Sequence, residues 1–64
     1  MQAHEQRVVD ELNALETKIG KLGTFVDKRS PDVDVQDMKL LVLQLGVMKT
    51  YAEILRQRIH RFTI

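Results

Sequence analysis

The chain has no cysteine and no tryptophan, and its 64 residues include only one proline, one tyrosine and three glycines. The lack of cysteine excludes disulfides and thiolate metal sites and suits a reducing compartment. No apolar run approaches the ~20 residues that span a bilayer, and we expect no secretory signal. We therefore predict one domain over residues 1–64, in the cytoplasm and without a membrane partner.

An excess of one charge is also missing, because ten Lys and Arg oppose nine Asp and Glu. No overall field therefore draws the chain to duplex nucleic acid. His4 and His60 are too few and too far apart for a metal cage. Ser30 is the only serine and has no histidine nearby in sequence, so a nucleophilic triad is not expected. We expect neither an enzyme nor a metal or cofactor site.

Apolar residues recur with a helical period in both halves of the chain. The first series comprises Val8, Leu12, Leu15, Ile19, Leu22 and Val26. The second comprises Met38, Leu41, Leu45, Met48, Ala52, Leu55, Ile59 and Phe62. Steps of three and four keep one seam of a helix against a partner helix. The pattern predicts one helix over about 3–26 and another over about 35–61.

Residues 27–34 form the predicted connector between the helices. Pro31 pushes Ser30 out of helical geometry, and Asp34 is the expected N-cap of the second helix. A connector this short makes the two helices antiparallel neighbours. The predicted fold is therefore an all-α hairpin, in which Arg7 lies at the same end as Arg58.

The second helix carries an additional apolar stripe that the hairpin does not use, formed by Leu40, Leu43, Val47, Tyr51 and Ile54. An exposed helix face is normally polar, and an exposed apolar patch marks an interaction site. A chain of this length also buries too little surface to be comfortably stable alone. We predict that these residues form the interface of a homo-oligomeric helical bundle. Gly46 inside the same helix suggests the close approach of another backbone.

Arg56, Arg58 and Arg61 make the end of the second helix basic. Such a cluster caps a helix C-terminus in solvent. It can also bind an anion, because the planar fork of arginine suits phosphate. Both interpretations remain open from the sequence.

Three segments, Arg7–Glu11, Leu15–Leu22 and Phe25-Val26, resemble the first helix of a family of short phage-encoded proteins, related to a crAss-like phage gene product. The second half is similar to the Gln-Leu…Met…Tyr…Leu…Arg-Ile pattern of that family, at Gln44, Leu45, Met48, Tyr51, Leu55, Arg58 and Ile59. The resemblance covers essentially the whole chain, although the connector with Pro31 departs from the family's Glu-rich connector. It implies a small bacteriophage protein in an infected bacterial host.

Small oligomeric phage hairpins of this architecture include sponges that counter CBASS and Thoeris defence. These sequester cyclic dinucleotides or cyclic ADP-ribose isomers, without cleavage, in pockets between protomers. By this analogy Gln44 would hydrogen-bond a base or ribose and Tyr51 would stack on a base, with phosphates held by Arg7, Lys18, Arg56 and Arg58. A fold alone does not fix a function. The alternative is a non-catalytic adaptor or inhibitor that binds a host protein through the apolar face of the second helix.

Overall fold

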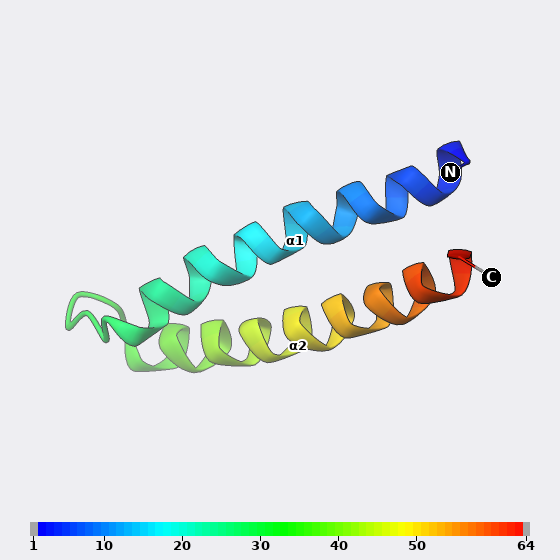
Figure 1. Ribbon diagram of the computed structural model, residues 1–64. Coiled ribbons are helices and arrows are strands. Elements are labelled where there is room, and N and C mark those ends of the chain that lie inside the picture. The colour runs from blue at the N-terminus through cyan, green and yellow to red at the C-terminus, as the bar shows by residue number, and fades with distance from the viewer. Residues whose placement is uncertain (1, 64) are drawn as a thin grey trace.

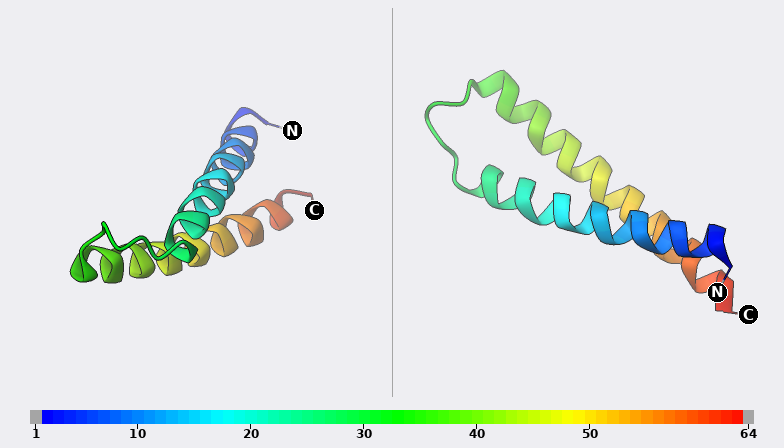
Figure 2. Two further views of the ribbon diagram at one scale, coloured as in Figure 1. Left: turned by 90° about the vertical axis from the view of Figure 1, so that its left-hand side faces the viewer. Right: turned by 90° about the horizontal axis from the view of Figure 1, so that it is seen from above.

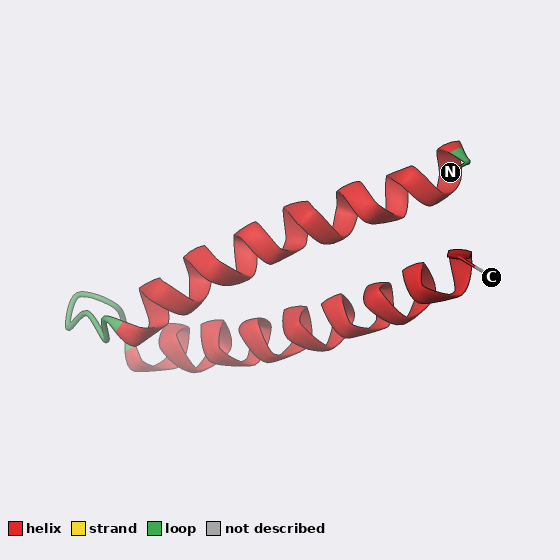
Figure 3. Cartoon of the chain, in the orientation of Figure 1, coloured by secondary structure: helices red, strands yellow, loops and turns green. Residues whose placement is uncertain are grey.

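The chain folds into an antiparallel pair of long helices in the computed structural model, which describes residues 2–63. Helix α1 spans Ala3–Asp27, helix α2 spans Val35–His60, and a short 3₁₀ helix, η1, covers Arg61–Thr63. The connector lies at one end of the pair and both termini lie at the other (Figure 1). No strand is present in residues 2–63 (Figure 3). The all-α hairpin predicted from the sequence is confirmed, with α2 giving way to η1 at Arg61.

Helix α1 ends in a backbone reversal at Arg29. The amide of Lys28 donates to the Thr24 carbonyl at 3.3 Å, and the amide of Arg29 donates to the Val26 carbonyl at 3.2 Å. Arg29 has a φ of 47°, in the left-handed region that costs an L-residue about 1–2 kcal/mol. This conformation turns the chain out of α1 and into the connector.

A tight turn around Pro31 leads into α2. The Ser30 carbonyl accepts from the Val33 amide at 3.3 Å, and the Ser30 hydroxyl accepts from the Asp32 amide at 3.3 Å. The Asp34 carboxylate then accepts from the Gln36 amide at 3.0 Å, as an N-cap does. The predicted helix break at Pro31 and the predicted cap at Asp34 are both confirmed.

The hydrophobic core is a thin seam between the two helices. Four apolar side chains of the described residues are buried, namely Val8, Leu15, Ala52 and Leu55. Partly buried residues extend this seam along the pair, among them Leu12, Ile19, Met48, Ile59 and Phe62. The two views of Figure 2 show that the helices cross at an angle. The rings of His4 and Phe62 meet edge to face at 6.4 Å, which ties the two ends of the chain together.

The hairpin is long and narrow, with extents of 48 × 14 × 14 Å. Its radius of gyration is 14.8 Å, whereas a compact chain of this length has a radius of gyration of about 11 Å. Its accessible surface is 5129 Å², against roughly 4200 Å² for a compact monomer of this mass. The hairpin therefore leaves much more surface in solvent than a globular domain does.

Candidate functional site

The face of α2 opposite the seam is apolar and exposed. We call it the back face, and it consists of Leu40, Leu43, Val47, Thr50 and Ile54, with Tyr51 at its edge. Leu40, Leu43 and Val47 are 63%, 66% and 69% exposed, so the stripe predicted from the sequence has no cover within the hairpin. A Cβ added at Gly46 would meet nothing within 4 Å. The close approach expected at this glycine is not made by the chain itself.

A hollow of about 770 Å³ lies on the hairpin where α1, the connector and the start of α2 meet. We call it the connector groove. Its apolar lining comprises Val26, Pro31, Val33, Val35, Met38, Val42 and Leu43. Its polar lining comprises only Arg29, Ser30 and Lys39. An apolar wall with a few polar groups, in this range of volume, is typical of small-molecule sites.

Sequence reasoning missed the connector groove, since none of the predicted ligand residues lines it. A signal was present in the connector, where Val33 and Val35 flank Asp34 in an otherwise polar segment. Exposure to water alone does not explain why two apolar side chains stand beside a helix N-cap. In the structure both line the groove.

The apolar surface continues from the connector groove onto the back face. A second hollow, of about 570 Å³, shares Val42 and Leu43 with the connector groove and runs past Gly46 to Ile54. The missing side chain at Gly46 deepens the surface at the middle of α2. The connector groove and the back face thus form one continuous apolar strip.

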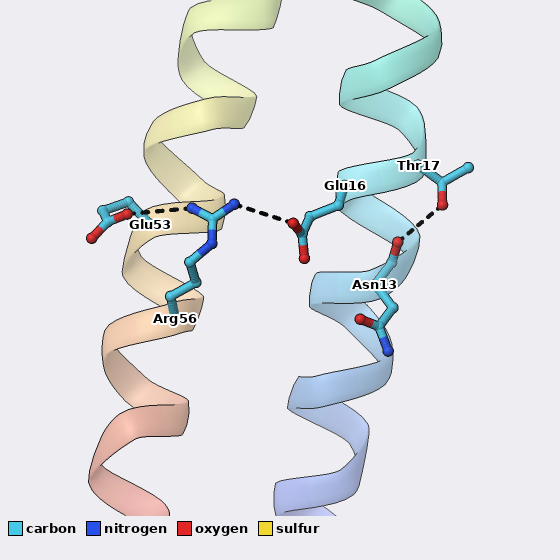
Figure 4. A network of polar contacts seen from close by, with 5 residues as sticks. All are labelled: Asn13, Glu16, Thr17, Glu53 and Arg56. Atoms are coloured by element: carbon cyan, nitrogen blue, oxygen red, sulfur yellow. Dashed lines mark hydrogen bonds and ion pairs between the residues drawn. The ribbon is translucent and has the colours of Figure 1, made fainter.

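A third hollow, of about 460 Å³, lies at the opposite end of α2. We call it the basic groove, and it is lined by Glu53, Arg56, Gln57, His60 and Arg61. Arg56 bridges two carboxylates here, Glu16 of α1 and Glu53 of α2, each at 3.3 Å (Figure 4). Half-exposed ion pairs contribute about 0–1 kcal/mol each. An anionic ligand can therefore compete with them for the guanidinium.

Tyr51 is engaged with α1 through a hydrogen bond from its hydroxyl to the Glu11 carboxylate. This bond raises the pKa of Tyr51, as do loss of solvation and the Glu11 charge, whereas the nearby Arg58 charge lowers it. The ring is 40% exposed. Tyr51 therefore holds the two helices together and still shows part of its ring to solvent.

The six predicted ligand residues do not gather at one place in a single protomer. Gln44 and Arg58 lie about 21 Å apart along α2, at 1.5 Å per residue, and Gln44 donates only a weak 3.9 Å bond to the Met48 sulfur. Arg7 and Lys18 lie about 16 Å apart along α1. One small ligand does not reach all of them. Within the hairpin, the structure offers separate grooves at the two ends of α2.

A metal site and a membrane-spanning helix can be assessed over the described part of the chain. No group of three His, Cys, Asp or Glu side chains in residues 2–63 is placed to hold a metal ion. Neither long helix in that range is apolar enough over its length to cross a membrane.

Comparison with protein families finds a match to the Sequestin family over residues 2–61. The match spans α1, the connector and α2, and so includes the connector groove and the back face. No curated protein and no solved structure matches the chain.

Proposed function

The chain belongs to the Sequestin family, and from that premise we propose that it binds and sequesters a nucleotide-derived immune signal without cleaving it. The ligand class that we propose is a cyclic nucleotide or a cyclic ADP-ribose type of molecule. By removing such a signal, a phage protein would counter the defence of its bacterial host. The family name supports sequestration, and the resemblance to phage hairpins supports the ligand class.

The connector groove is the observation that carries this proposal. Its apolar wall suits the flat faces of a base or ribose, and its two cations, Arg29 and Lys39, suit phosphates. Ser30 adds a hydroxyl to the same lining. The volume of about 770 Å³ accommodates a nucleotide-sized molecule.

The composition of the groove also favours binding over hydrolysis. Cleavage by a serine needs a base next to the hydroxyl. The groove is lined by no His, Asp, Glu or Cys. The Ser30 hydroxyl oxygen in the lining accepts a hydrogen bond from the Asp32 amide. A bound ligand should therefore leave the protein unchanged.

A ligand panel tests the proposal directly. Cyclic dinucleotides, cyclic ADP-ribose isomers and ADP-ribose are titrated by calorimetry and by thermal shift, and the bound ligand is recovered by heating and identified by mass spectrometry. We expect one class to bind and to be recovered intact. Arg29→Ala and Lys39→Ala should each weaken binding about 10- to 100-fold, as expected for a lost charge-assisted contact. Lys21→Ala, which removes an exposed cation on α1 outside the groove, is the matched control and should bind normally.

Two results would contradict the proposal. One is the absence of both heat and thermal shift across the whole panel. The other is recovery of a cleaved ligand, which would make the protein an enzyme.

A second candidate function is a non-catalytic adaptor or inhibitor that binds a host protein. The exposure of Leu43 and Val47 on the back face favours it. If the ligand panel is negative, a pull-down from host lysate with wild-type protein is the next experiment. Val47→Asp, which places a charge on the back face, serves as its control and should release any specific partner.

A further inference from the structure

The apolar back face of α2 is nearly symmetric about Val47. Leu40 and Ile54 lie at equal distances before and after Val47 in the sequence, and so do Leu43 and Tyr51. The steps of three and four along this face are those of a coiled-coil seam. A helix face whose apolar residues have almost the same spacing in both directions can pack against an inverted copy of itself, as a two-fold dimer interface requires.

Charged residues on the two edges of the back face fit the antiparallel direction. On one edge Asp37 precedes Val47 and Arg58 follows it at almost the same distance. In an antiparallel pair Asp37 lies beside the partner's Arg58. Antiparallel packing also brings opposite ends of the two helix dipoles together.

The charges on the other edge of the back face also fit the antiparallel direction. Lys39 precedes Val47 and Glu53 follows it, so in an antiparallel pair Lys39 lies beside the partner's Glu53. Glu53 already accepts from Arg56 at 3.3 Å, and a carboxylate has capacity for a further donor. Gly46 lies on this edge between them, and nothing lies within 4 Å of a Cβ added there.

The two end grooves of α2 lie on this same edge. Lys39 of the connector groove and Gln57 of the basic groove are separated by about five full helical turns, so they point in the same direction. The same spacing relates Val35 to Glu53. Because each end of α2 meets the opposite end of the partner in an antiparallel pair, the connector groove of one protomer lies beside the basic groove of the other.

We propose that a second copy of the chain docks antiparallel on the back face of α2, with the two-fold axis at Val47. Each connector groove is then completed by the basic groove of the partner. The composite site surrounds one apolar floor with Arg29 and Lys39 and with the partner's Arg61. The choice of ligand, an anion with an apolar body, depends on the proposed function. The docking depends only on the symmetry and the charges of α2.

Cross-linking tests the docking, because the chain has no cysteine of its own. Val47→Cys should form a covalent dimer with a short bifunctional maleimide. Leu40→Cys and Ile54→Cys should link to each other when mixed, and each should link poorly to itself. Ala14→Cys, on the exposed side of α1, is the control and should stay monomeric. Self-linking of Leu40→Cys and Ile54→Cys without cross-linking between them would overturn the antiparallel arrangement, and a monomeric mass of wild type at micromolar concentration would overturn the dimer.

Subunit mixing tests the composite groove, with ADP-ribose and cyclic di-AMP as probes. Arg29→Ala and Arg61→Ala should each lose at least 10-fold in affinity. Mixed together they should regain about a quarter of the wild-type sites, since random exchange of subunits in a two-fold dimer leaves one intact groove in each mixed dimer. If Arg61→Ala binds like wild type, the composite groove is wrong and the proposed function stands on the connector groove alone. If wild type binds neither probe nor any panel ligand, the proposed function fails, and the cross-links still decide the docking.

Discussion

Replacing Arg29 with glycine should stabilise the hairpin and at the same time weaken ligand binding. Arg29 has a φ of 47°, a conformation that costs an L-residue about 1–2 kcal/mol and glycine nothing. Glycine loses more conformational entropy on folding, at a cost of about 0.5–1 kcal/mol. The net gain in the free energy of unfolding is therefore about 0.5–1 kcal/mol. The same substitution removes one of the two cations of the connector groove.

Urea unfolding followed by circular dichroism at 222 nm measures the stability difference by linear extrapolation. All variants are compared at one protomer concentration, because association changes apparent stability. Lys28→Gly is the matched control, since Lys28 has a φ of −68° and no strain to relieve, and it should lose about 0.5–1 kcal/mol. Arg29→Ala separates the two effects, because it removes the guanidinium and keeps the left-handed backbone. It should lose ligand affinity without gaining stability.

Two results would refute this reasoning separately. A destabilisation of Arg29→Gly as large as that of Lys28→Gly would show that the end of α1 is not strained. Unchanged affinity of Arg29→Gly for the ligand that wild type binds would show that Arg29 does not hold the anion.

Three further substitutions have defined outcomes. Leu55→Ala removes a side chain that is 0% exposed and should cost about 2–5 kcal/mol, seen as loss of helical signal at low urea. Val47→Asp leaves the seam between α1 and α2 intact but should halve the mass in light scattering, and an unchanged mass would exclude the back face as the interface. The raised pKa of Tyr51 means that its bond to Glu11 stabilises the fold fully below the ordinary tyrosine pKa of about 10 and is lost as pH rises through the raised value. Tyr51→Phe should therefore be less stable than wild type at neutral pH and should lack this alkaline loss in a series of melting temperatures.

The helices and their limits could be predicted from the sequence because local rules set them. The 3.5-residue period placed both helices, Pro31 placed the break and Asp34 placed the cap. The left-handed residue at the end of α1 could not be predicted, since glycine or asparagine usually occupies that position and the chain has Arg29 there. The connector groove was missed for a different reason. It exists because the turn brings Arg29 and Val33 to the same hollow as Val42 of α2, and no local pattern encodes that arrangement.

The candidate ligand residues were only partly predictable from the sequence. The helical period shows which face of α2 carries Tyr51 and which carries Arg56. It does not show which α1 residue lies opposite, because that depends on how the two helices cross. The structure pairs Tyr51 with Glu11 and Arg56 with Glu16. Tyr51 and Arg56, which were predicted to bind a ligand, therefore already make contacts with α1.

Those intramolecular contacts make sense if dimerisation and ligand binding are coupled. Arg56 holds Glu16 and Glu53 with separate nitrogens of its guanidinium. When the partner's Lys39 approaches Glu53, the carboxylate gains a competing cation and the hold on Arg56 weakens. Docking thus loosens the hold of Glu53 on Arg56, while the partner's Lys39 takes its place at the edge of the composite site. Because each of these ion pairs is exposed and screened by salt, the dimer mass and the ligand affinity should fall together as ionic strength rises. A ligand affinity that stays constant while the dimer dissociates would place the whole site within one protomer.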